Sequence, residues 1–120
     1  MNKFEVFSDI PEPLFEKYVQ LDKIAVDTEL HGLTMNRDQI CLVQLCDKDE
    51  EVCLVRPGPD LDYMRLKSLM ENKYVKKIFH FALTDVAFFK TSLNIVVSPF
   101  CCTKVMSKLI RTYTQSHGLK

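Results

Sequence analysis

The stretch Ile24-Ala25-Val26-Asp27-Thr28-Glu29 ends a short apolar run with two carboxylates. Its residue types predict a β-strand over Lys23 to Leu30, and successive side chains on a strand point to opposite faces. Asp27 and Glu29 should therefore lie side by side on one face, at the end of that strand. Two ionised carboxylates this close repel each other, and burying them unpaired is unfavourable. The pair is thus a candidate site for a hard divalent metal ion.

Short connections lead from this strand to the next two. We expect a polar loop over His31 to Asp38, a strand over Gln39 to Cys46, and a strand over Glu51 to Val55. Because a parallel crossover needs about a dozen residues or more, these three strands should be antiparallel neighbours.

The flanking segments predict the rest of the fold. Before the first acidic strand, we expect a short edge strand at Phe4 to Phe7 and a helix that begins near Pro11 and Pro13 and ends at about Gln20. After the third of the antiparallel strands we expect a helix over Asp60 to Asn72, with Asp60 as a possible N-cap. Its candidate buried positions are Leu61, Met64, Leu66 and Leu69. The remaining expected elements are a strand (Lys76 to Phe81), a helix (Leu83 to Ser92), a short strand (Ile95 to Val97) and a helix (Thr103 to Thr112). A strand–helix–strand unit implies parallel pairing through a right-handed crossover. The predicted fold is a mixed α/β sheet with an antiparallel three-strand portion, parallel strands and flanking helices.

Composition limits the function classes. The chain has 120 residues, enough for one domain, and 16 basic and 16 acidic residues give it zero formal net charge. This balance weighs against broad electrostatic coating of nucleic acid, but not against a small site where metal ions supply the positive charge. Five cysteines without a C-x-x-C pair indicate core thiols in a reducing cytosol rather than disulfides or a zinc site. The sequence shows neither a signal-peptide core nor an apolar run of about 18–20 residues. We therefore expect a soluble cytoplasmic protein with no membrane partner.

A third acid follows the second predicted parallel strand. In His80-Phe81-Ala82-Leu83-Thr84-Asp85, Asp85 falls in the first turn of the next helix, at the sheet edge where α/β folds usually bind ligands. If the strands at 23–30 and 76–81 are adjacent, Asp85 could face Asp27 and Glu29. Oxygen ligands alone suit Mg²⁺ or Mn²⁺, and such a cluster fits two-metal phosphoryl chemistry.

These segments, in this order, resemble the ribonuclease D-type 3′→5′ exonucleases of the DEDD superfamily. Val26-Asp27-Thr28-Glu29 with Ile40-Cys41-Leu42-Val43-Gln44-Leu45-Cys46 is similar to the first motif of the family. His80-Phe81-Ala82 with Asp85 is similar to the second, and Cys102-Thr103-Lys104 through His117-Gly118-Leu119-Lys120 resembles the next helix and the start of its H-G-L segment. The resemblance implies a ribonuclease H-like fold.

It also implies roles for particular residues. Asp27 would bind two metal ions, Glu29 the ion that activates water, and Asp85 the ion on the leaving-group side. Thr28 and Leu30 would lie near the terminal nucleotide of a single-stranded RNA or DNA 3′ end, with Phe81 in the same cleft. His31 follows the acids, and a substrate contact is an alternative to a solvated loop position. The product would be a nucleoside 5′-monophosphate.

The chain departs from the family pattern in two places. Cys102 stands where the family commonly has an acid, although that acid is not one of the four metal ligands. The third motif, with the water-orienting Tyr or His and the fourth acid, is missing before Lys120. We therefore expect a truncated or shortened exonuclease with impaired activity, whose uncovered apolar face favours self-association.

Other interpretations remain open from the sequence. The chain could be an inactive nucleic-acid-binding or interaction module on the same fold, or a different two-metal phosphoesterase. Asp27 and Glu29 could be an ordinary solvated strand end, and Asp85 an acid favoured by the helix dipole. His80 reads as a packed strand residue. Lys73, Lys76 and Lys77 form a small basic cluster, read as a solvated turn or a phosphate contact.

Overall fold

The computed structural model describes residues 5–30, 39–49, 51–58, 62–80 and 82–103, and they form one mixed sheet with three helices. The sheet has six strands in the order β1-β4-β3-β2-β5-β6. The strands are β1 (Val6–Phe7), β2 (Lys23–Leu30), β3 (Ile40–Cys46), β4 (Val52–Val55), β5 (Lys76–Phe79) and β6 (Phe100–Cys102). The helices are α1 (Glu12–Tyr18), α2 (Met64–Glu71) and α3 (Ala82–Leu93).

The strand directions confirm the predicted topology. β3 pairs antiparallel with both β2 and β4, while β5 pairs parallel with β2 and with β6. The edge strand β1 pairs parallel with β4. The two strands that precede the candidate acids, β2 and β5, are therefore direct neighbours, as the carboxylate hypothesis requires.

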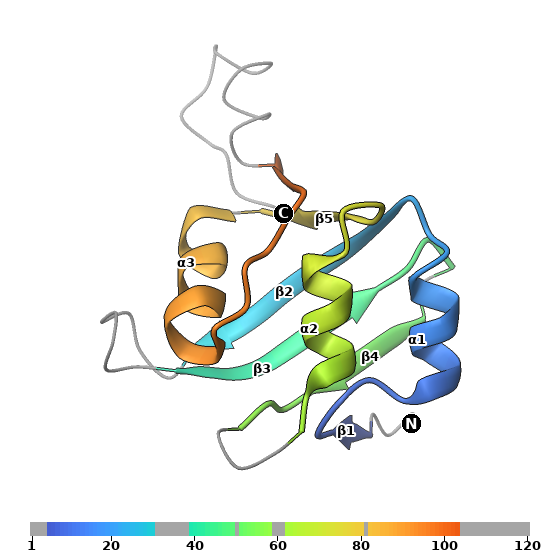
Figure 1. Cartoon of the computed structure of the whole chain (residues 1–120), viewed down its shortest axis with the longest axis horizontal. Coiled ribbons are helices and arrows are strands. Elements are labelled where there is room, and N and C mark those ends of the chain that lie inside the picture. Colours follow the sequence, from blue (N-terminus) through green and yellow to red (C-terminus); the bar gives the residue numbers. More distant parts are fainter. Residues whose placement is uncertain (1–4, 31–38, 50, 59–61, 81, 104–120) are drawn as a thin grey trace.

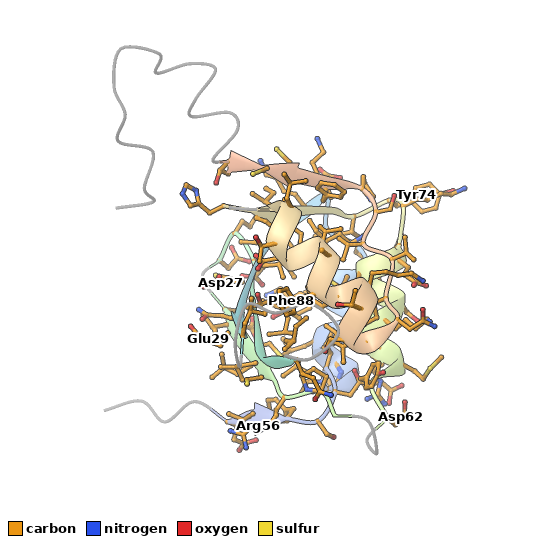
Figure 2. All side chains as sticks on the ribbon, turned by 90° about the vertical axis from the view of Figure 1, so that its left-hand side faces the viewer. Asp27, Glu29, Arg56, Asp62, Tyr74 and Phe88 are labelled. Carbon is orange, nitrogen blue, oxygen red and sulfur yellow. The ribbon has the colours of Figure 1, made fainter. Side chains whose placement is uncertain are left out.

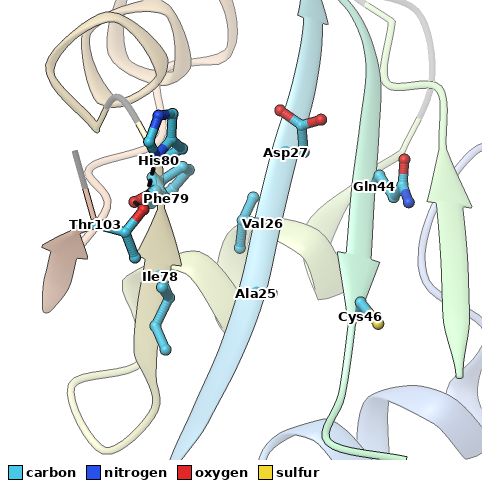
Figure 3. Close-up of a pocket in the computed structure, with 9 residues that line it drawn as sticks. All are labelled: Ala25, Val26, Asp27, Gln44, Cys46, Ile78, Phe79, His80 and Thr103. Carbon is cyan, nitrogen blue, oxygen red and sulfur yellow. Dashed lines mark hydrogen bonds between the residues drawn. The ribbon is translucent and has the colours of Figure 1, made fainter. Parts of the chain in front are cut away.

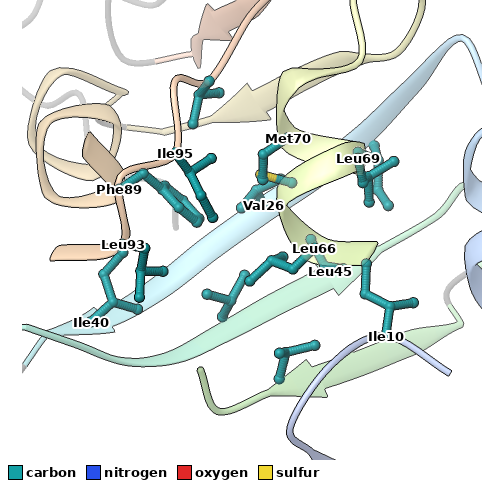
Figure 4. Packing of buried hydrophobic residues seen from close by; sticks show 14 of the residues in the cluster. Ile10, Val26, Ile40, Leu45, Leu66, Leu69, Met70, Phe89, Leu93 and Ile95 are labelled. Atoms are coloured by element: carbon teal, nitrogen blue, oxygen red, sulfur yellow. The ribbon is translucent and has the colours of Figure 1, made fainter. Parts of the chain in front are cut away.

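All three helices lie on one face of the sheet (Figure 1). Alternate residues of the central strands face them: Val26 and Leu45 are buried against Leu66 of α2 and Phe89 of α3 in one continuous core (Figure 4). The intervening residues, such as Ala25 and Gln44, are exposed on the other face. Within the described ranges no helix covers that second face, so its polar and apolar side chains are accessible beside β2.

The start of α2 differs from the prediction because a residue from another part of the chain caps the helix. The helix begins at Met64, which is 60% exposed rather than buried, whereas the predicted buried positions Leu66 and Leu69 are fully buried. The carboxylate of Asp9, on the β1–α1 connection, accepts hydrogen bonds from the backbone N–H groups of Arg65 and Leu66. A helix cap supplied by a residue far away in the sequence cannot be predicted from the residues of the helix itself. The predicted cap, Asp60, and Leu61 lie outside the described residues.

The predicted strand at Ile95 to Val97 is wrong. Asn94 has a positive φ of 56° and ends α3, and the backbone N–H of Val96 bonds to Glu71 Oε2 instead of to a strand. Ile95 and Val97 are nevertheless buried in the core. Their alternating apolar pattern therefore indicates a buried segment without regular structure. The strand in this part of the chain is β6, at Phe100–Cys102.

The other boundaries shift by a few residues. The edge strand begins at Val6, α1 ends at Tyr18, and α3 runs one residue further than predicted at each end. Residues 104–112, predicted as a helix, lie outside the described residues, as does the loop 31–38.

Two predictions about individual side chains need correction. Of the five cysteines, only Cys53 is buried, and Cys41 is exposed. Lys77 does not belong to a solvated basic turn, because its side chain is fully buried. In the described part of the chain, no helix is long and apolar enough to span a membrane.

Candidate active site

Asp27 and Glu29 both lie on the face of β2 that is turned away from the helices (Figure 2). They are exposed, while Ile24 and Val26 on the opposite face are buried. In the sheet register Asp27 pairs with Gln44, and the ladder shifts between Glu29 and Leu30. The alternation of the strand therefore places the two carboxylates on one face, as the spacing predicts.

Asp85 comes to this strand from the first turn of α3, directly after β5. The hydroxyl of Thr28 donates a 2.7 Å hydrogen bond to Asp85 Oδ1. Burial and the negative charge of Asp27 both raise the pKa of Asp85, and the Thr28 hydrogen bond opposes them. A carboxylate that is close to another acid and partly buried favours a cation nearby.

The three acids are not gathered at metal-binding spacing. Among the described residues, no group of three or more His, Cys, Asp or Glu side chains could hold a metal ion as placed. Asp27 and Asp85 interact electrostatically, whereas the exposed Glu29 points into solvent farther along β2. As placed, the three acids therefore do not form one common set of metal ligands.

The other predicted site residues lie in different surroundings. Thr28 faces the helix side, where its hydroxyl is bound to Asp85. Leu30 is half-buried and packs against the core at the end of β2. His31 and Phe81 lie outside the described residues.

A cavity of about 290 Å³ opens on the uncovered face directly beside Asp27. Nine residues of β2, β3, β5 and the segments after β5 and β6 line it (Figure 3): Ala25, Val26, Asp27, Gln44, Cys46, Ile78, Phe79, His80 and Thr103. His80 Nδ1 lies 2.9 Å from Thr103 Oγ1, which donates to the carbonyl oxygen of Phe79. The hydroxyl therefore accepts from Nδ1–H, and Nε2 is left as the acceptor nitrogen in the neutral ring. Sequence reasoning missed Gln44 and Thr103 because only the sheet register brings them beside Asp27.

The cysteine that replaces a family acid has a clear local role. Cys102 Sγ accepts from the backbone N–H of Ala82, at the start of α3, and donates to the carbonyl oxygen of His80. It therefore fixes the turn between β5 and α3, which carries Asp85.

Known proteins share this architecture. The chain is 30% identical over 88 residues to ribonuclease D of Bartonella henselae and 29% identical over 87 residues to that of Nitrobacter hamburgensis. These alignments cover 73% and 72% of the chain but only 22% and 23% of the relatives. The chain thus spans less than a quarter of the length of these curated relatives.

Solved structures give the same picture. NrnC of Brucella melitensis superposes with a TM-score of 0.86 at 34% identity, covering 96% of the chain and 55% of NrnC. NrnC has also been solved with bound Mg²⁺ and bound to pGG. Ribonuclease D of Escherichia coli shares the fold at a TM-score of 0.71 and 22% identity, over 98% of the chain and 35% of that protein.

The ribonuclease H-like α/β fold predicted from the sequence is therefore confirmed. The model of the 3′-5′ exonuclease family matches residues 7–120, nearly the whole chain. This chain belongs to the 3′-5′ exonuclease family.

Proposed function

We propose that this chain is the part of a divalent-metal-dependent 3′→5′ exonuclease that carries Asp27, Glu29 and Asp85, acting on single-stranded RNA or DNA 3′ ends and releasing nucleoside 5′-monophosphates. The observation that carries the proposal is the approach of Asp85 to β2. Two acids that are 58 positions apart in the sequence influence each other electrostatically at one edge of the sheet. No structural purpose requires that juxtaposition, since like charges at close range destabilise a fold.

The donor chemistry fits a hard divalent cation. Carboxylate oxygens are the ligands that Mg²⁺ and Mn²⁺ prefer, and the mutual repulsion of Asp27 and Asp85 is an excess of negative charge that such a cation would neutralise. The Mg²⁺-bound form of the relative NrnC supports the same choice. Asp27 would contact both ions of a two-ion site, Glu29 one of them and Asp85 the other. When bound, the ions would lower the pKa of water and neutralise charge on the leaving oxygen.

The single-stranded substrate is supported by the relative that binds pGG. The half-buried Leu30 ends β2 directly after Glu29 and would offer an apolar contact to a terminal base. His31 and Phe81 would complete this contact. Five cysteines that form no disulfide suit a reducing compartment, so the reaction would take place in the cytoplasm.

The test is a hydrolysis assay on the 120-residue chain. Single strands carrying a 3′-terminal label are incubated with Mg²⁺ or Mn²⁺, and mononucleotide release is followed for the wild type, Asp27→Asn and the control Asp22→Asn. Asp22 is an exposed acid just before β2. We expect release by the wild type and Asp22→Asn, and a loss of at least about 100-fold in Asp27→Asn, the scale of a lost catalytic group.

A strand blocked by a 3′-phosphate tests the direction of attack, because a 3′→5′ exonuclease should leave it largely intact. Binding of the strand without release would instead identify a non-catalytic nucleic-acid-binding module. Equal release by the wild type and Asp27→Asn would refute the assignment of Asp27.

A further inference from the structure

Thr28 lies between the two acids of β2 in sequence but not in space. The pleat turns Asp27 and Glu29 to the uncovered face and turns Thr28 to the helix side, in line with the buried Ile24 and Val26. An apolar side chain would be the ordinary choice there, because this face forms the core. A threonine at this position therefore calls for a hydrogen-bond partner.

The partner is the carboxylate of Asp85. Thr28 Oγ1 donates to Asp85 Oδ1 at 2.7 Å, a short, charge-assisted bond that joins β2 to the first turn of α3. The described residues place no second hydrogen-bond donor on this carboxylate. One oxygen of Asp85 is therefore fixed by Thr28, and Oδ2 is available to another ligand.

We propose that Thr28 is a positioning residue that holds Asp85 Oδ1 so that Oδ2 is presented to a divalent cation shared with Asp27. The inference rests on the proposed function, and it replaces the nucleotide contact expected for Thr28. Hydrogen bonds to ligating groups orient those groups, and removing one typically weakens metal binding about 10- to 100-fold.

The experiment measures Mn²⁺ affinity without nucleic acid, by the electron paramagnetic resonance signal of free Mn²⁺. Thr28→Val keeps the shape of the side chain but cannot donate, and Thr28→Ser keeps the hydroxyl. We expect Thr28→Val to bind Mn²⁺ about 10- to 100-fold more weakly than the wild type, and Thr28→Ser to restore most of the affinity.

Thr91→Val is the matched control. Thr91 also lies on α3, and its hydroxyl donates to the carbonyl oxygen of Ala87 within the helix. Its substitution should leave Mn²⁺ affinity unchanged. Circular dichroism of each variant shows whether it is folded, so that a lost affinity is not read from an unfolded chain.

Two results would overturn the inference: Mn²⁺ affinity in Thr28→Val equal to that of the wild type, or no Mn²⁺ binding by the wild type. A nucleotide-contacting Thr28 would give the first result together with a raised KM for the single strand. Failure of the proposed function looks different, because Mn²⁺ would then bind in a Thr28-dependent way without any nucleotide release.

Discussion

Lys77 Nζ donates a 2.9 Å hydrogen bond to the carbonyl oxygen of Ser98, just before β6. The same ammonium donates to the carbonyl oxygen of Asn72, at the end of α2, and the whole side chain is buried. Lys77 therefore ties three segments together at the start of β5. Burial lowers the pKa of Lys77 to about 8, because the charged form is poorly solvated there.

Replacement of this residue should change the pH dependence of stability. In the unfolded chain the lysine titrates near 10.5 and in the folded chain near 8, so between these values the unfolded state binds more protons. The free energy of unfolding of the wild type should then rise with pH over this interval, by on the order of 2–3 kcal/mol. In Lys77→Met this contribution is absent. Urea unfolding at pH 7.5 and pH 10 measures the difference.

The exposed Lys48 offers the control, since Lys48→Met should follow the wild-type pH dependence. Parallel stability curves for the wild type and Lys77→Met would show that Lys77 titrates normally and would contradict the prediction.

Much of this fold could be predicted from the sequence because its signals are local. The lengths of the connections between β2, β3 and β4 dictated antiparallel pairing, and the strand–helix–strand order dictated the parallel neighbour β5. Where the prediction failed, a distant group decided the structure. Asp9 sets the start of α2 from outside the helix, and Glu71 holds Val96 away from the sheet.

For the candidate site, too, local features could be predicted and contacts between distant segments could not. The alternation of β2 was enough to place Asp27 and Glu29 on one face. The partner of Thr28 could not be predicted, because it depends on the rotation of α3 about its axis and on the depth at which that helix packs. The cavity beside Asp27 depends on the register between β2 and β3, which brings Gln44 opposite Asp27.

Asp9 should be a measurable stabiliser of α2. Its two carboxylate oxygens accept from the backbone N–H groups of Arg65 and Leu66 at 2.9 and 2.8 Å, donors that the first turn of the helix leaves unpaired. Asp9→Ala should lower the free energy of unfolding by about 1–2 kcal/mol, the upper range for a lost cap. Chemical denaturation measures it. Asp62→Ala, which removes one exposed hydrogen bond to the Met64 N–H, should lower the free energy of unfolding by less. Equal losses of stability in the two variants would argue against a special role for Asp9.

Asp47 should make the fold sensitive to acid. Its buried Oδ1 accepts from the backbone N–H groups of Asp49 and Glu51, and Oδ2 lies 2.9 Å from Lys17 Nζ. Although burial acts to raise it, the pKa of Asp47 is lowered by the Lys17 ammonium and these two N–H groups. A lowered pKa stabilises the fold above the unfolded value of 3.8, and the contribution disappears as the pH falls below it.

Asp47→Asn keeps the acceptor for the turn and removes the charge. Its melting temperature should fall below that of the wild type at pH 7, and the gap should narrow progressively below pH 3.8. Thermal unfolding from pH 7 to pH 2.5 gives the comparison, with the exposed Asp22→Asn as control. A gap that stays constant across this range would mean that the Lys17 pair contributes nothing.

Asp85→Asn should separate two effects of the Asp85 charge: its destabilisation of the metal-free fold and its contribution to metal binding. Without metal, the variant should be more stable than the wild type at pH 7, because burial and the charge of Asp27 oppose the carboxylate, while the asparagine oxygen can still accept from Thr28. Added Mn²⁺ should reverse the order, since a ligand that binds only the folded wild type raises its stability by about 2.7 kcal/mol at 100 times its Kd. Thermal unfolding with and without Mn²⁺ provides both comparisons. A variant that is less stable without metal, and equally stabilised by Mn²⁺, would make Asp85 a structural acid of α3.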